Sequence, residues 1–219
     1  MARAFAEIAF TNSVKAAQSR YGSRKANTGF ELDVDRRDTL GGHEAAFLAE
    51  RDSFYIASVG DNGWPYVQHR GGPKGFLKVL DEKTLGFADF RGNRQYISVG
   101  NLNADGRVSL FVMDYPNRAR LKLWAWARVV HADEDPALLA RLELPGHKAR
   151  VERGIVLTVA AIEWNCPQHI TPRYTQEEVE RLIAPVLEEN RLLQARLALA
   201  VGQEGREPDI NTTIAQNEE

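Results

Sequence analysis

The sequence predicts a mainly β protein, an antiparallel β-barrel with flanking helices and a long C-terminal helix. Between residues 53 and 163, seven β-prone segments follow one another, most of them separated by tight turns and few by helices. Short turns join antiparallel neighbours, whereas parallel strands need long crossover connections, so this spacing favours a barrel over a parallel α/β sheet. The C-terminal helix is predicted from apolar residues that recur at helical spacing in residues 175–200.

The first 40 residues are expected to form a polar N-terminal arm. One short helix is predicted there at Ser13–Arg20, and the turn-rich stretch Tyr21–Asp38 that follows receives no assigned element. Residues 41–173 are predicted to form the barrel domain. It begins with a helix at His43–Glu50, whose alanine, phenylalanine and leucine side chains are available for packing.

The strands and two further helices of the barrel domain are expected in chain order. Asn93 is the expected N-cap of the first of these helices, because an asparagine side chain can accept a hydrogen bond from the first turn. The predicted strands are Ser53–Val59, Trp64–Arg70, Phe76–Leu80, Thr84–Asp89, Arg107–Met113, Leu121–His131 and Gly154–Glu163, and the predicted helices are Asn93–Leu102 and Pro136–Leu142.

Two turns carry the most specific local signals. Gly60-Asp61-Asn62-Gly63 separates the first two strands, and Asn and Gly tolerate the positive φ angles that tight hairpin turns require. Asp81-Glu82-Lys83 separates the next two strands and predicts a second hairpin.

Residues 174–219 are predicted to form an amphipathic helix and a polar tail. The helix is expected over Thr175–Ala200, since Thr175 and Glu178 have the spacing of a capping box and Gly202 lies just past the predicted end. Pro185 is expected to kink or split this helix, because proline lacks the backbone N–H that the helix ladder needs.

Composition narrows the function classes. The 219 residues include 28 Lys+Arg and 30 Asp+Glu, a net charge of −2, which argues against a protein that coats nucleic acid. No apolar run approaches the roughly 18–20 residues of a membrane helix, and Met1–Phe10 has no apolar core of a secretory signal. The single cysteine, Cys166, can form no internal disulfide. The expectation is a cytoplasmic protein.

The net charge conceals two segments of opposite sign. Residues 68–96 hold six basic and three acidic residues, whereas residues 175–219 hold four basic and ten acidic residues. The first segment is also rich in glycine, so backbone amides can approach an anion that Arg and Lys side chains attract. The predicted helix start at Asn93 and Arg94 adds free N–H groups, and we therefore expect a phosphate there. No Gly-Lys-Ser/Thr follows the glycines, so this is not a P-loop.

Other interpretations of these residues stay open. The glycines and arginines of residues 68–96 also fit ordinary turns with solvated charges. Cys166 and His169 could form a thiolate–imidazole pair, but the flanking sequence matches no protease motif. The five histidines share no metal-ligand spacing, so no metal site is predicted. Trp124 and Trp126 share one face of a strand and could stack on a planar ligand or simply pack in a core.

Residues 75–114 resemble the FMN-binding core of the pyridoxamine 5′-phosphate oxidase-like split-barrel flavoproteins. The likeness is carried by Phe76–Lys83, Phe87–Arg94 and Arg107–Phe111. They match the family's strand ending in Lys, its Asp-Glu-Lys turn, its Ser-Arg-Lys helix start and its Arg-Val-Ser-Leu strand, without gaps. The arm and terminal helix look closer to a bacterial subgroup of predicted flavin-nucleotide-binding proteins. The resemblance implies an FMN-binding split barrel.

The resemblance also implies roles for individual residues. Arg94 matches the family's phosphate-binding Arg, Asn93 the Ser before it, and Lys78 a strand Lys near the phosphate and ribityl chain. Gln95 stands where the family has a second phosphate-binding Lys, and Arg70, Lys74 or Arg91 could replace that charge. The cofactor-binding residues expected are Gln68, His69, Arg70, Lys78, Arg91, Asn93, Arg94, Gln95, Arg120, Lys122 and Trp124, with Arg120 and Lys122 reaching the flavin of a partner subunit.

The function implied by the resemblance is FMN-dependent redox chemistry on an unidentified small molecule, with NAD(P)H as a candidate electron donor. No catalytic residue is assigned, since the flavin would carry the chemistry. A homodimer with FMN between two barrels is expected, without nucleic-acid or membrane partners. Two alternatives are a flavin-nucleotide-binding carrier without catalysis and a genuine pyridoxamine 5′-phosphate oxidase.

Overall fold

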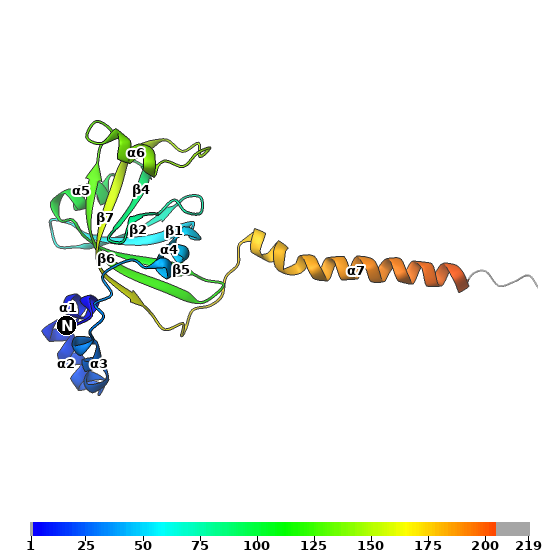
Figure 1. Cartoon of the computed structure of the whole chain (residues 1–219), viewed down its shortest axis with the longest axis horizontal. Coiled ribbons are helices and arrows are strands. Elements are labelled where there is room, and N and C mark those ends of the chain that lie inside the picture. The colour runs from blue at the N-terminus through cyan, green and yellow to red at the C-terminus, as the bar shows by residue number, and fades with distance from the viewer. Residues whose placement is uncertain (1, 205–219) are drawn as a thin grey trace, which may run out of the picture. The chain divides into compact units, whose positions relative to one another are not determined.

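The computed structural model describes residues 2–204, and its strands form one antiparallel sheet that curls into a barrel (Figure 1). The seven strands follow the order β2-β1-β5-β6-β7-β4-β3, and each neighbouring pair is antiparallel. The predicted mainly β class with flanking helices is confirmed. The strands are β1 (Ser53–Val59), β2 (Pro65–Gly71), β3 (Lys78–Asp81), β4 (Thr84–Phe90), β5 (Arg107–Asp114), β6 (Ala119–Val130) and β7 (Val151–Trp164).

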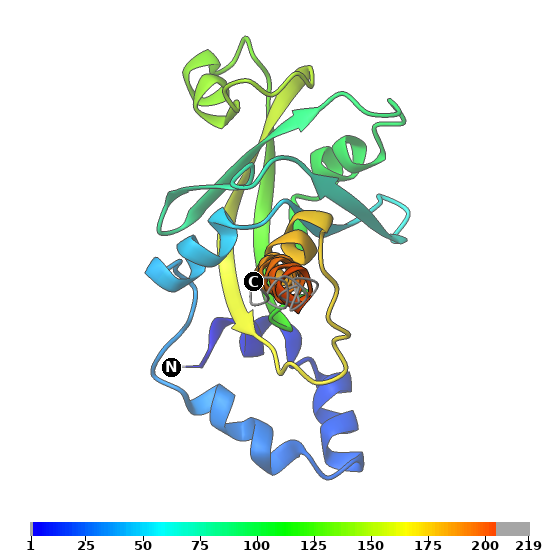
Figure 2. The same ribbon diagram turned by 90° about the vertical axis from the view of Figure 1, so that its right-hand side faces the viewer.

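Helices lie before, between and after the strands. The chain divides after Pro172 into two compact units, so the last helix is described by itself. In the first unit, α1–α3 gather at one end of the barrel and α6 lies at the other (Figure 1, Figure 2). The helices are α1 (Ala4–Ala9), α2 (Asn12–Arg20), α3 (Arg24–Leu32), α4 (Gly42–Ala49), α5 (Ile97–Ala104), α6 (Pro136–Leu142) and α7 (Gln176–Glu204).

The barrel is filled by side chains that alternate along its strands. In β5, buried and partly exposed residues alternate from Val108 to Asp114, as expected for a strand with one face toward a core. The rings of Phe54, Phe76 and Phe87 meet at centroid distances of 5.3–6.5 Å, and each residue is at most 2% exposed. This aromatic cluster joins β1, β4 and the segment before β3 into one core.

Both predicted hairpins are confirmed. Val59 of β1 pairs with Pro65 of β2, and Gly63 between them has φ +83°, the left-handed region that a residue with a Cβ rarely adopts. Asp81 of β3 pairs with Thr84 of β4 across the second turn. The sequence predicted these hairpins because a short turn depends mainly on its own residues.

The N-terminal arm is more helical than predicted. The helix at Ser13–Arg20 is confirmed as part of α2, but α1 and α3 were not predicted, and α3 occupies much of the unassigned stretch Tyr21–Asp38. Such short helices are marginal alone and depend on tertiary packing. Here Phe5 of α1 packs on Phe10, Phe30 and Trp124, which places the arm on the outer face of β6 and β7.

The helix expected at Asn93–Leu102 begins later, and its predicted N-cap is wrong. α5 starts at Ile97 with Tyr96 as N-cap. Arg94 and Tyr96 have φ angles of 64° and 55°, which a right-handed helix excludes. The side-chain oxygen of Asn93 instead accepts the backbone N–H of Gln95 at 3.1 Å, an Asx turn that competes with the helix.

Strand boundaries differ from the prediction where tertiary pairing extends or replaces them. β3 begins at Lys78, because Phe76 and Leu77 are buried ahead of the strand and are not paired in it. β7 begins at Val151, three residues before the predicted start, because it pairs with β4 as far as Phe90. This extension brings Glu152 and Arg153 to the end of β4.

The second unit contains α7, whose predicted start is confirmed. The Thr175 hydroxyl oxygen accepts the backbone N–H of Glu178 at 3.2 Å, and the Glu178 carboxylate accepts that of Thr175 at 2.8 Å, a capping box. The helix is not split at Pro185, and it continues through Gly202, so the predicted end was wrong. The tail beyond residue 204 lies outside the described residues. No helix in the described part of the chain is long and apolar enough to cross a membrane.

The turn before β5 carries a testable ionisation. Arg107 donates side-chain and backbone hydrogen bonds to the Asp105 carboxylate, and these lower its pKa to about 2. Its contribution to stability is therefore present above the ordinary pKa of 3.8 and is lost as the pH falls through about 2. In Arg107→Gln we expect the pKa of Asp105 to rise toward 3.8, measured by NMR titration of its carboxyl carbon. An unchanged value would contradict the role of Arg107.

Candidate functional site

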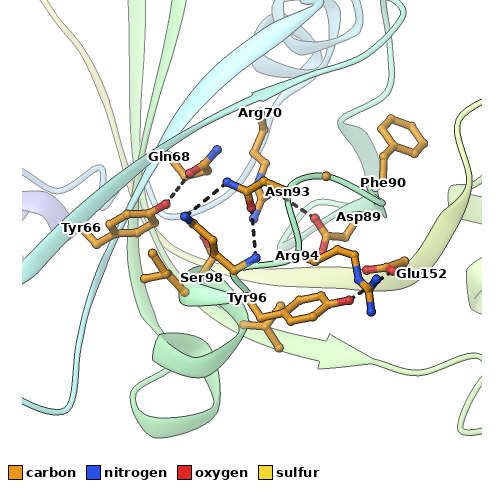
Figure 3. Close-up of a pocket in the computed structure, with 14 residues that line it drawn as sticks. Tyr66, Gln68, Arg70, Asp89, Phe90, Asn93, Arg94, Tyr96, Ser98 and Glu152 are labelled. Carbon is orange, nitrogen blue, oxygen red and sulfur yellow. Dashed lines mark hydrogen bonds and ion pairs between the residues drawn. The ribbon is translucent and has the colours of Figure 1, made fainter.

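A pocket with a cavity volume of about 190 Å³ lies where β2, β4, the start of α5 and the start of β7 meet. Figure 3 shows side chains of β2 on one side of this pocket and those of β4 and β7 on the other, with Asn93 between them. The lining residues are Tyr66, Gln68, Arg70, Asp89, Phe90, Gly92, Asn93, Arg94, Gln95, Tyr96, Ile97, Ser98, Val99 and Glu152.

The curl of the sheet brings the pocket walls together. β2 and β4 are far apart in the strand order and do not pair with each other. A guanidinium nitrogen of Arg70 on β2 nevertheless lies 3.1 Å from a carboxylate oxygen of Asp89 on β4. Asp89 in turn lies directly opposite Arg153 on the neighbouring strand β7. A salt bridge therefore links the two sides of the barrel where backbone pairing does not.

Asp89 is a buried carboxylate among arginines. Burial raises its pKa above the ordinary value, while the charges of Arg70 and Arg153 oppose that rise and the charge of Glu152 adds to it. Arg153 also contacts Glu152 at 2.6 Å and stacks on the Tyr96 ring at 5.0 Å. This network holds Arg70 in place at the pocket wall.

Three buried polar atoms in this network lack a hydrogen-bond partner. They are Nε of Arg70, Oδ1 of Asp89 and Nε of Arg153. The contact between Arg70 and Asp89 is thus an ion pair whose angles do not make a hydrogen bond at Oδ1. Buried polar groups normally find partners, and an unpaired one at a pocket wall points to a ligand or an ordered water.

Backbone geometry supplies further donors. Arg94 and Tyr96 both have left-handed φ angles, a strained arrangement that concentrates at functional sites. The backbone N–H of Gly100 donates to the backbone oxygen of Tyr96, which is the first helical hydrogen bond of α5. The side chain of Tyr96 does not cap the helix. The N–H groups of residues 97–99 therefore lie in a first turn without such a cap, and all three residues line the pocket.

The structure brings together five of the predicted site residues. Gln68 and Arg70 alternate on β2 with their side chains toward the pocket, and Asn93, Arg94 and Gln95 form its loop wall. A sixth predicted residue, Arg91, does not line the pocket, but its guanidinium lies 3.8 Å from the carboxylate of Glu152, which does.

Two predicted residues lie away from this pocket. His69 is on the opposite face of β2, where its ring meets that of Tyr55 at 5.5 Å. The amino group of Lys78 donates to the backbone oxygens of Arg141 and Glu143 at 2.6 and 2.8 Å, at the end of α6. A lysine commonly satisfies the last carbonyls of a helix in this way.

The three predicted residues of β6 lie on its outer face, away from the pocket. Arg120 stacks on Phe111, and its Nε is buried without a hydrogen-bond partner. Lys122 is 3.8 Å from Glu163, whose pKa is raised by burial despite the opposing charge of Lys122. Trp124 stacks on Phe5 of α1 at 6.2 Å, so the packing interpretation of this tryptophan holds within one chain.

Sequence reasoning missed five polar lining residues: Tyr66, Asp89, Tyr96, Ser98 and Glu152. Tyr66 was predictable, because it alternates with Gln68 and Arg70 along the same strand. Asp89 was also visible as an acidic residue in an otherwise apolar strand. Glu152 carried no such signal, since it was placed outside the strand that positions it.

The charged groups in and around the pocket carry a net positive charge. Four guanidinium groups, those of Arg70, Arg91, Arg94 and Arg153, lie in or next to it, against two carboxylates, Asp89 and Glu152. The excess of two positive charges matches a phosphate monoester, which carries about −1.5 to −2 near neutral pH. Within the described residues, no group of three or more His, Cys, Asp or Glu side chains is placed to hold a metal ion.

Solved structures similar to this chain are distant from it in sequence. A protein related to general stress protein 26 from Clostridium acetobutylicum is 16% identical, with a TM-score of 0.44, over 63% of this chain and 94% of that one. An FMN-binding protein from Syntrophomonas wolfei is 14% identical, with a TM-score of 0.43, over 57% and 85%. The search of curated proteins found no match.

A family model identifies the barrel directly. The model described as pyridoxamine 5′-phosphate oxidase matches residues 41–163, which is more than half of the chain. These residues contain every strand of the sheet except the last residue of β7, together with the whole pocket. The chain therefore belongs to the pyridoxamine 5′-phosphate oxidase family.

Proposed function

We propose that the protein binds FMN and carries out redox chemistry on a small molecule. The observation that carries this proposal is the anion pocket in which Arg70, Arg94 and the first turn of α5 converge. In this proposal Arg70 and Arg94 hold the flavin phosphate, with the unpaired Nε of Arg70 as one donor. The N–H groups of residues 97–99 complete the phosphate site.

The size of the pocket limits what one chain holds. Pockets for cofactor-sized ligands usually enclose roughly 300–1,000 Å³, whereas this cavity measures about 190 Å³. It fits a phosphate and the adjoining part of the ribityl chain. We therefore propose that a second copy of the chain covers the flavin ring, with twofold symmetry. Arg120 and Lys122 are the candidates to contact it, and the unpaired Nε of Arg120 leaves one donor for that purpose.

FMN, when bound, would supply the oxidation or reduction of the substrate. The protein's own residues would position the phosphate and exclude water from the ribityl chain. Tyr66 and Gln68 are joined by a hydrogen bond and line the pocket wall nearest β2, where they can orient the polar part of the flavin. NAD(P)H is the candidate electron donor. The substrate and the donor are to be identified by the experiments that follow.

The first experiment is the absorption spectrum of the purified protein. We expect a yellow protein with flavin absorption, or stoichiometric uptake of added FMN. A colourless protein that takes up no FMN would refute the proposal. Reduction by NADH or NADPH with steady reoxidation by an acceptor would separate an enzyme from a flavin carrier, and formation of pyridoxal phosphate from the amine in air would indicate the namesake oxidase.

Arg94→Ala tests the phosphate contact. We expect FMN to bind about 1.5–3 kcal/mol more weakly, because a hydrogen bond from a charged group is lost. Isothermal titration with FMN measures the change, and Arg107→Gln is the control, since Arg107 is exposed and pairs locally with Asp105. Equal affinities in Arg94→Ala and the parent protein would show that Arg94 does not contact the phosphate.

A further inference from the structure

The last helix of the described chain carries an apolar stripe that nothing in the described part of its own unit covers. Every residue from Val179 to Val201 is exposed, although this segment is rich in leucine and valine. A helix in water gains most of its stability by burying one apolar face. This face of α7 therefore needs a partner.

The spacing of the apolar residues indicates the kind of partner. One series of positions along α7, spaced alternately four and three residues apart, is apolar at every position except residue 190. Its average period is 3.5 residues, which is the heptad of a coiled coil. With Val179 at a d position, the a and d residues are Val179, Ile183, Val186, Asn190, Leu193, Leu197 and Ala200.

The polar residues agree with this assignment. Two ion pairs of the helix, Arg181 with Glu177 and Arg191 with Glu188, lie at b and f positions on the outer face. Pro185 falls at a c position, also outside the seam, so its ring and missing N–H are away from the partner. The a and d positions from residue 179 to residue 200 hold no charged residue, so packing of this seam against a partner would bury no charge.

Asn190 identifies the partner. It occupies an a position in the middle of the seam, where its amide would be buried among apolar side chains and unsatisfied unless a matching polar group faces it. In a parallel pair of identical helices in register, each a residue faces its own copy. Asn190 then meets a second Asn190, and an amide can both donate and accept. In an antiparallel pair, a faces d, and Asn190 would meet an apolar side chain.

The flanking e and g positions fit the same arrangement. In the parallel register, Leu182 of one copy faces Leu187 of the other and widens the apolar seam. Glu189 faces Gln194, and Arg196 faces Val201, so no like charges meet. We propose that α7 forms a parallel, in-register coiled coil with α7 of a second copy of this chain. This interface is separate from the pocket and does not depend on flavin binding.

Site-specific disulfide formation in the full-length chain tests this arrangement. The single native cysteine is exposed and is first replaced as Cys166→Ser. In that background, Leu193→Cys puts a thiol at a d position of the seam, and Ala195→Cys puts one at an f position on the outer face. On mild oxidation we expect a covalent dimer with Leu193→Cys and only background with Ala195→Cys, on a non-reducing gel.

The other outcomes overturn the proposal. An antiparallel pair, or a helix docked on a barrel or another protein, leaves the two thiols at position 193 apart and gives no covalent dimer. Equal cross-linking at positions 193 and 195 would show random collision. Because both positions are exposed, these variants keep the barrel intact, which FMN uptake or, if the proposed flavin site fails, circular dichroism verifies. The added substitution Asn190→Leu should reduce the preference for the in-register dimer, through higher oligomers or shifted registers.

Discussion

A variant with both Arg70→Gln and Arg94→Gln is expected to bind FMN about 3–6 kcal/mol more weakly than the parent protein, roughly 10²- to 10⁴-fold in Kd. Each guanidinium is proposed to make a charged hydrogen bond to the phosphate, and the two come from different walls of the pocket. The range assumes that the two losses add, which holds best for groups without a shared partner. Quenching of FMN fluorescence on titration measures the affinity.

Riboflavin provides the sharpest control for this prediction, because it has the same ring and ribityl chain and no phosphate. The double variant should bind riboflavin as well as the parent protein does. A matched loss of riboflavin and FMN affinity would place the arginines against the ring or in the folding of the pocket. Equal FMN affinity in the variant and parent would remove both residues from the phosphate site.

The substitution Arg51→Met is expected to lower the free energy of unfolding by about 3–5 kcal/mol. A guanidinium nitrogen of Arg51 lies 2.8 Å from the Asp114 carboxylate, and the two side chains are 17% and 8% exposed. Without Arg51, a buried carboxylate remains with the backbone N–H and side-chain amide of Asn117 as its donors. Urea unfolding followed by circular dichroism measures the change.

A surface ion pair serves as the matched control. Lys74 lies 3.4 Å from Glu50, and both side chains are more than half exposed, so Lys74→Met should change stability by at most about 1 kcal/mol. Adding Asp114→Asn to Arg51→Met should recover part of the loss, because it removes the unpaired charge. Similar losses in Arg51→Met and Lys74→Met would show that burial of the Arg51 pair does not matter.

Local signals predicted much of the fold. The Gly60–Gly63 and Asp81–Lys83 turns, the alternation of the strands and the Thr175–Glu178 capping box depend on residues close together in sequence. They fold as predicted, and with them the antiparallel order of hairpins that defines the class. The short helices α1 and α3 escaped prediction because their stability comes from contacts such as Phe5 on Trp124, far apart in the chain.

The candidate site shows the same division. Charge and glycine content marked the segment 68–96, and five of its predicted residues line one pocket. The sequence could not show that Lys78 turns to the carbonyls at the end of α6, or that left-handed angles at Arg94 and Tyr96 delay the helix. Both outcomes depend on which neighbour satisfies a polar group, and that neighbour is known only after folding.

The sequence by itself therefore determined the class of the protein: an antiparallel barrel with a basic, glycine-rich segment suited to an anion and a long helix with an apolar stripe. Its turns, strand period and charge pattern each depend on residues close together in the sequence, so they can be recognised without the tertiary structure. Only the tertiary structure decided where the pocket forms. The curl of the sheet brings Arg70 on β2 to Asp89 on β4, although the strands carrying them lie far apart in the sheet order and do not pair.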